Sequence, residues 1–212
     1  MVAVVGTTQK FLNPTEDNYG VDAIFTDIYT NPNFIEPFGS GGAGFTREGN
    51  IYRVASAGLN PSTINGLYVV ATYTFPGNSF DAALRGISIS AMGSVANNTN
   101  SKTIAVYYNC TTAVVGSLVS GGTVIATTGA YTTTGAAAFQ LLVNVYKYGA
   151  AASNTQISTH ETVQIGTTLP ALTVPQALTA TESGPIIVAL VCDAVTATTD
   201  ISVNLFAING MD

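Results

Sequence analysis

From about residue 65 onward, the chain consists of apolar segments of strand length bounded by Gly, Asn, Ser and Pro. In Ile87–Met92 and Ile201–Ile208, apolar and small polar side chains alternate. Such alternation is typical of a half-buried strand, because successive side chains point to opposite faces of a sheet. We expect eight strands, at about 66–75, 84–92, 102–109, 122–128, 137–148, 155–165, 185–193 and 199–208.

The strand pattern predicts an all-β fold, since no segment shows a helical stripe of apolar residues. The 212 residues fit a single sandwich or barrel. Eight short antiparallel strands separated by turns favour a two-sheet β-sandwich, and an eight-stranded jelly roll is the most economical arrangement. A barrel stays open as the alternative. Residues 137–165 read as a hairpin whose tip lies at 150–154.

Residues 1–64 differ from the rest of the chain. They contain four prolines, half of the acidic residues and a glycine-rich run at 39–44, which we interpret as a hinge. They also contain more aromatic residues than a disordered linker would hold. We therefore expect an extended N-terminal arm over 1–64, ordered against its own domain or a neighbouring subunit, and a jelly-roll sandwich over 65–212.

The chain is poor in charge: only 8% of its residues are charged, against about 25% in an ordinary soluble domain. Thirty threonines take much of that place, and threonine favours strands because its branched Cβ fits a pleated sheet. A surface with few ions costs little to desolvate, so it suits a protein that is covered by neighbours. The alternative is a threonine-coated soluble monomer.

The distribution of charge argues against several partners. The net charge is −6, and no basic residue has another beside it, whereas binding to nucleic acid needs clustered cations. The scattered bases are Lys10, Arg47, Arg53, Arg85, Lys102 and Lys147. The apolar start of the chain is short and has no basic flank, so we expect no secretory signal. Apolar runs such as Ile186–Cys192 are far shorter than a membrane helix needs.

No catalytic constellation emerges from the sequence. His160 is the only histidine, and strict alternation places it on a polar strand face with Ser158, Thr162 and Gln164, where a solvated or interface role is favoured. No Gly-x-Ser-x-Gly turn accompanies it. Glycosidases need a carboxylate pair; within the β region the candidates are Asp81, Glu161, Glu182, Asp193 and Asp200. Arg85 and Lys102 read as solvated strand ends. We expect a protein that is not an enzyme.

Metal and cofactor sites are also not expected. A zinc site needs several Cys or His residues at close spacing, which the chain lacks. Glu16, Asp17 and Asp22 could help to hold calcium, but the spacing of a calcium loop is missing. Cys110 and Cys192 could pair, although free buried thiols are the simpler interpretation. The run at 39–44 lacks the Lys and Ser/Thr of a phosphate-binding loop.

Two segments carry a resemblance. In residues 73–89, a strand ends in Pro76 and a small polar turn and is followed by a strand that contains Gly86. In residues 96–104, an Asn-rich turn leads into Lys-Thr-Ile. Over about 65–148, with a weaker echo toward the C-terminus, this arrangement resembles jelly-roll proteins of tailed-phage virions. Residues 1–64 do not contribute to the resemblance.

The resemblance implies a virion component without an active site. Such proteins include capsid decoration, or cement, subunits, commonly trimers on the capsid surface, and fibre or baseplate modules that contact host glycans. The sequence therefore favours a decoration subunit that is made in the host cytoplasm and binds the major capsid protein as a homo-oligomer. The alternative is a receptor-binding or glycan-binding module of a tail fibre or baseplate.

Overall fold

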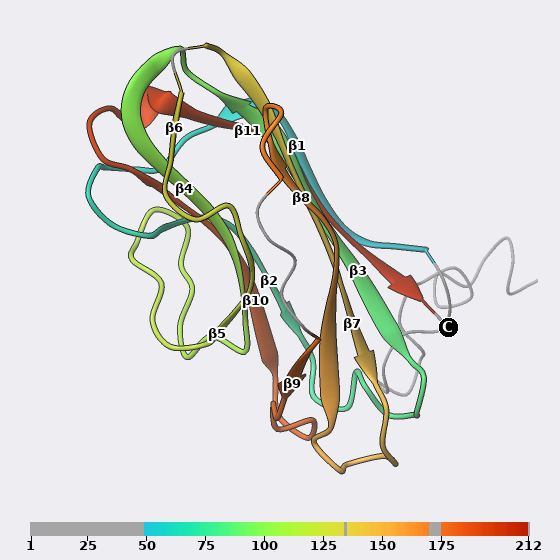
Figure 1. Ribbon diagram of the computed structural model, residues 1–212. Helices are drawn as coiled ribbons and strands as arrows, with labels where there is room; N and C mark the ends of the chain where they lie inside the picture. The colour runs from blue at the N-terminus through green and yellow to red at the C-terminus, as the bar shows by residue number, and fades with distance from the viewer. Residues whose placement is uncertain (1–48, 134, 170–174, 212) are drawn as a thin grey trace, which may run out of the picture.

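The computed structural model describes residues 49–133, 135–169 and 175–211, which form two antiparallel β-sheets packed face to face (Figure 1). The larger sheet has the order β1-β11-β3-β7-β8-β9, and the smaller one β2-β10-β4-β5, with β6 paired to β4. The strands are β1 (Gly49–Leu59), β2 (Tyr68–Phe75), β3 (Gly86–Val95), β4 (Asn98–Tyr108), β5 (Thr123–Thr127), β6 (Tyr131–Thr133), β7 (Ala137–Lys147), β8 (Gln156–Ile165), β9 (Gln176–Leu178), β10 (Ile186–Ala194) and β11 (Ile201–Met211).

The connections give the jelly-roll topology. The chain crosses from one sheet to the other six times: between β1 and β2, β2 and β3, β3 and β4, β6 and β7, β9 and β10, and β10 and β11. As a result β1-β11-β3-β7 faces β2-β10-β4-β5, as in a double Greek key of eight strands. The hairpin strand β8 and the short β9 extend the larger sheet beyond β7. The expected antiparallel sandwich is confirmed.

Strand β1 differs from the sequence-based expectation, which placed residues 49–64 in the arm. Gly49–Leu59 pair with β11 and form one edge of the larger sheet, so the strand expected to open the sandwich is its second. The register of β1 shifts twice, between Asn50 and Tyr52 and between Ala55 and Leu59. These bulges, with the weak strand formers in Ala55–Gly58, hide the two-residue period that reveals the other strands. Residues 1–48 lie outside the described residues.

The core lies between the sheets and is almost entirely aliphatic and aromatic. It includes Ile87, Ile89, Val106, Leu190 and Phe206, none of which is exposed. Aromatic rings continue from the core to the edge formed by β1 and β2, where the rings of Tyr52 and Tyr73 stack with centroids 5.0 Å apart. The rings tie the two edge strands across the sandwich, adding attraction beyond their burial.

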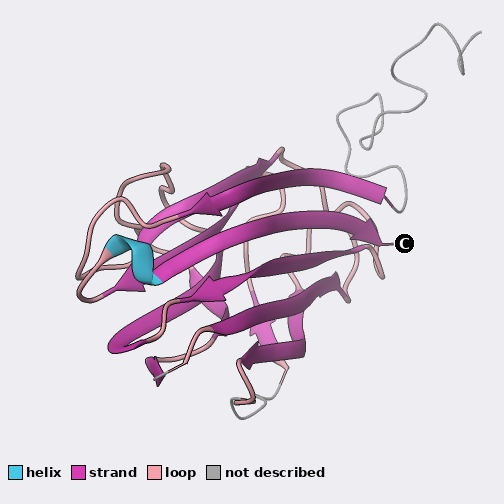
Figure 2. Cartoon of the chain, turned by 90° about the horizontal axis from the view of Figure 1, so that it is seen from above, coloured by secondary structure: helices cyan, strands magenta, loops and turns pink. Residues whose placement is uncertain are grey.

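One helical turn is present among the described residues: η2 (Thr198–Asp200), which leads into β11. Figure 2 shows it at the end of the sandwich away from the C-terminus. No helix in the described part of the chain is long and apolar enough to cross a membrane.

The close contact of β3 with β7 and β11 predicts a strict requirement for glycine at position 93. A Cβ atom on Gly93 would lie 2.1 Å from the carbonyl oxygen of Ser202 and 2.6 Å from the Phe139 ring. We expect Gly93→Ala to lower the free energy of unfolding by about 2 kcal/mol, because the backbone must shift to make room. Urea denaturation measures this change. Gly135→Ala, where an added Cβ meets nothing within 4 Å, is the control; equal losses in both variants would refute the argument.

Candidate functional site

Four of the five carboxylates weighed as a catalytic pair have described side chains, and they lie in separate sets of contacts; the side chain of Glu161 lies outside what the structure describes. Asp81 forms an ion pair with Arg85, with 2.7 Å between Oδ1 and Nη1, and Asp193 accepts a hydrogen bond from the Gly66 amide. Glu182 and Asp200 are buried in separate polar networks. Each of these four side chains is therefore paired with a cation or a hydrogen-bond donor of the protein.

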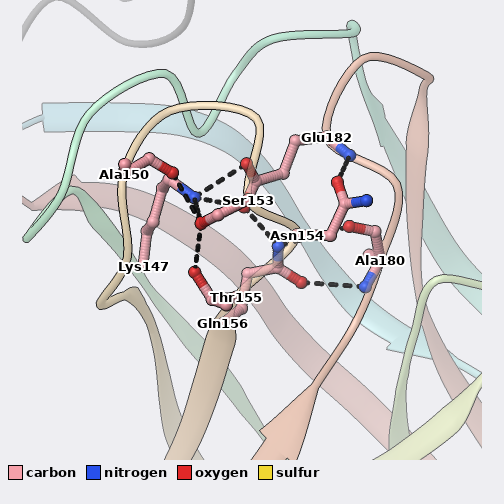
Figure 3. A network of polar contacts seen from close by, with 8 residues as sticks. All are labelled: Lys147, Ala150, Ser153, Asn154, Thr155, Gln156, Ala180 and Glu182. Atoms are coloured by element: carbon pink, nitrogen blue, oxygen red, sulfur yellow. Dashed lines mark hydrogen bonds and ion pairs between the residues drawn. The ribbon is translucent and has the colours of Figure 1, made fainter.

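The first network contains a buried ion pair. Lys147, at the end of β7, is fully buried, and its Nζ donates to both carboxylate oxygens of Glu182 at 2.7 Å. Gln156 donates to the same carboxylate and also bonds the backbone of Ala180 in both directions. Figure 3 shows these groups converging between the β7–β8 turn and the segment that precedes β10. The network joins segments that are about 35 residues apart along the chain.

The second network surrounds Lys102, which the sequence analysis placed at a solvated strand end. That expectation is wrong: Lys102 is fully buried. Its Nζ donates to the Asn98 carbonyl, the Asn98 Oδ1 and the Asn100 carbonyl at 2.7 to 3.0 Å. The amides of Asn98 and Asn100 in turn donate to the two carboxylate oxygens of Asp200. The amides thus link the cation to the anion that balances it.

The two networks lie at opposite ends of strand β3. The Lys147 amide donates to the carbonyl of Arg85, just before β3, and the Ala96 amide, just after β3, donates to the carbonyl of Asp200. Burial alone would raise the pKa of Glu182 and of Asp200. The hydrogen bonds from Lys147 and Gln156 to Glu182, and from the two asparagines to Asp200, together with the nearby lysine charges, hold both pKa values below their ordinary range.

Burial of these groups leaves few ions on the exterior. Of the four basic residues in the described part of the chain, Lys102 and Lys147 are buried, which leaves only Arg53 and Arg85 at the surface. The cysteines add no surface chemistry, because Cys110 and Cys192 are free and buried. The outside of the sandwich is therefore poorer in charge than the composition alone indicated.

Strand β8 does not keep strict alternation. Its register with β7 shifts where Leu142 pairs with Thr162 and Val143 pairs with His160, so Glu161 is an extra residue. The residues predicted to share one strand face with His160 therefore do not share it: Ser158 is buried, while Thr162 and Gln164 are partly exposed. Among the residues described, no cluster of His, Cys, Asp and Glu could hold a metal ion. Glu16, Asp17, Asp22 and the glycine run at 39–44 lie outside the described residues.

A loop with apolar side chains lies over the smaller sheet. We call residues 111–121 the EF loop, because β4 and β5, which they connect, take the places of strands E and F in a jelly roll whose eight strands are lettered B to I. Its backbone is hydrogen-bonded to Leu67 and Val69 at the start of β2. Ala113 and Val119 pack inward against the outer side of the sheet. Val114, Val115 and Leu118 are 63%, 60% and 55% exposed. The loop thus presents three uncharged aliphatic side chains on a backbone that is hydrogen-bonded to β2.

The outer face of the larger sheet has a different character. Its strands carry Ser88, Ser90, Gln140, Thr162 and Gln164 between a few apolar residues. Near one end of this face, a hollow of about 270 Å³ is lined by Met92, Gly93, Ala138, Phe139, Gln140, Gln164 and Gly166. None of the described residues that line it has an ionisable side chain. The sequence analysis did not identify this hollow or the EF loop, because neither follows from a sequence motif.

Comparisons with known proteins add little. No protein-family model matches the chain, and no curated protein matches it. Among solved structures, the chain is similar to the CBM2 module of the evolved Dit of Lactobacillus casei BL23 phage J-1, at 10% identity over 82% of this chain and 84% of that one. The TM-score is 0.32, which is too low to assign a fold or a function to the chain.

The lowered pKa values predict how stability depends on pH. Both carboxyls have a lower pKa in the folded protein than in the unfolded chain, so the stability they contribute is present at neutral pH and is lost as the pH falls. For Glu182 the loss begins below its ordinary pKa of 4.5. Glu182→Gln leaves the Lys147 charge buried without a counter-ion, and at pH 7 it should cost about 3 kcal/mol. Urea denaturation at pH 7 and pH 3 should show the difference from the parent protein shrinking in acid.

Asp81→Asn provides the matched control, because the ion pair of Asp81 with Arg85 is partly exposed. Such pairs contribute about 1 kcal/mol or less. A gap between the parent protein and Glu182→Gln that stays the same at both pH values would contradict the assignment.

Proposed function

We propose that this chain is a non-catalytic structural subunit of a virion, a decoration protein that binds the assembled capsid shell and packs against copies of itself. The observation that carries the proposal is the exterior of the sandwich. It keeps Arg53 and Arg85 as its only surface bases among the described residues, while the EF loop presents Val114, Val115 and Leu118 to solvent. Covering such a surface removes apolar area from water and strips few ions of their hydration.

The resemblance of residues 65–148 to jelly-roll virion proteins supports the same role. Its partners in this proposal are the major capsid protein and further copies of the chain, with a trimer as the expected assembly. The residues that precede β1 are proposed to contact the shell. A ligand that binds only the assembled shell stabilises it by mass action.

A receptor-binding module of a tail fibre or baseplate is the second candidate. The observation that favours it is the uncharged hollow on the larger sheet, which has amide side chains beside apolar ones.

Virions that lack the protein test the leading proposal. We expect them to release their nucleic acid at a lower temperature than complete virions, and we expect addition of the purified protein to restore the difference. Electron microscopy of labelled particles would place the subunit on the capsid. Unchanged heat resistance together with label at the tail would reject capsid decoration and favour the second candidate.

The EF loop should control self-association. Val114→Ser with Val115→Ser removes two exposed aliphatic side chains and adds none of the strain of a core substitution. We expect the dissociation constant of the oligomer, measured by analytical ultracentrifugation, to rise at least about tenfold, since burying one valine contributes about 1.5 kcal/mol or more.

Leu169→Ser is the matched control, because Leu169 is 68% exposed and follows β8 of the other sheet. A parent protein that sediments as a monomer at all concentrations would exclude an EF-loop contact between copies, and so would a double variant that assembles like the parent.

A further inference from the structure

We propose that the hollow on the outer face of the larger sheet is a binding site for an uncharged sugar unit of a polysaccharide. The proposal goes beyond the structural role, which does not require this face. Its centre is a row of three side chains that lie side by side on neighbouring strands: Met92 of β3 pairs with Gln140 of β7, and Gln140 pairs with Gln164 of β8.

The shape of the hollow follows from small residues around this row. Ala138 and Gly166 border it, and Gly93 lies beneath it. Gly93 cannot be replaced without a clash with the Ser202 carbonyl, and Gly166 has a φ of +57°, a conformation that favours glycine. Gly93 and Gly166 thus line the hollow with backbone alone, and its volume is about 270 Å³. A space of this size suits a single ring better than a large ligand.

The two side-chain amides of the hollow keep hydrogen-bonding groups that a ligand can reach. The Gln164 Nε2 donates to the carbonyl of Gly166 at 2.8 Å, which fixes the amide and directs its Oε1 away from that bond. No hydrogen bond from the Gln140 amide to the described part of the chain is present. Side-chain amides both donate and accept hydrogen bonds. Two of them at neighbouring register positions can bond a pair of adjacent hydroxyl groups.

The apolar groups and the absence of charge narrow the ligand class further. The Met92 side chain is 38% exposed, and its thioether offers a surface for C–H groups. No described carboxylate, lysine or arginine lines the hollow, so none of these residues would neutralise a sulfate, phosphate or uronate, and burying such an ion without a partner is costly. A neutral pyranose has one polar edge and one apolar face, and it matches both sets of groups.

The site lies on an open sheet face, which suits a polymer. Past the hollow, the same face continues along β3 and β7 with Ser90, Leu142 and Ser88. These positions are uncharged and partly exposed. A chain of sugars could extend over them while one unit occupies the hollow, and hydroxyl groups along the strands could bond its neighbours.

The test is a glycan array that carries neutral oligosaccharides of glucose, galactose, mannose and rhamnose beside sialylated and uronate-containing ones, probed with the full-length protein. We expect binding to neutral oligosaccharides only. Isothermal titration with the best array ligand should show affinity lowered about tenfold in Gln140→Leu, which keeps the bulk and removes the hydrogen bonds. Ala138→Glu, at an exposed position, fills the rim of the hollow and should abolish binding.

Gln176→Ala is the matched control, since Gln176 is an exposed glutamine on β9 outside the hollow. Circular dichroism and urea denaturation check that each variant is folded, and Ala138→Glu is informative if Gln140→Leu is not stable. Binding of anionic glycans only, binding unchanged in both hollow variants, or no bound glycan would each overturn the proposal. None of these outcomes affects the heat-resistance test of capsid decoration, so the two proposals can fail separately.

Discussion

The structure depends on closing the two ends of a sandwich with buried, fully bonded ions. Lys147 with Glu182 and Lys102 with Asp200 lie at opposite ends of β3, and all four side chains are buried. Removing such ions from water costs several kcal/mol each, and the cost is offset only when every donor and acceptor finds a partner. Amides complete both networks: Gln156 in the first, and Asn98 with Asn100 in the second. Each network fixes the position of two distant segments relative to each other, because a slip in strand register would leave a buried charge unpaired.

Placing these ions inside shapes the outside. The polar residues of the exterior are mainly threonine, serine, asparagine and glutamine. The outer faces of the two sheets differ in how far they are covered. On the smaller sheet, the EF loop covers an apolar strip with Ala113 and Val119 and turns three other aliphatic side chains outward. On the larger sheet, small polar residues remain uncovered around the hollow. One face is therefore suited to burial against protein, and the other to contact with a hydroxyl-rich ligand.

Much of the fold could be predicted from the sequence, because strands with one buried face keep a two-residue period. The expected segments near 66–75, 137–148 and 185–193 correspond closely to β2, β7 and β10. Strand β1 was missed where two bulges interrupt that period, and the division of β8 was missed for the same reason at Glu161. The burial of Lys102 could not be predicted, since the aspartate that balances its charge is reached only through the amides of Asn98 and Asn100, and it lies about 100 residues further along the chain. The sequence indicates alternation, whereas bulges and long-range pairing decide which side of the sheet a polar residue occupies.

The same reasoning explains why the EF loop and the hollow could not be predicted from the sequence. It also explains why both surfaces can be in use at the same time. Each is defined by residues from separate strands brought together by register: Leu67 and Val69 against the loop, and Met92, Gln140 and Gln164 across three strands. They lie on the outer sides of opposite sheets, with the whole core between them. A subunit that packs through its EF loop therefore leaves the hollow accessible. Under the two proposals, copies assembled on one particle would bind a polysaccharide more tightly than a single copy, because several weak sites act together with a high effective concentration.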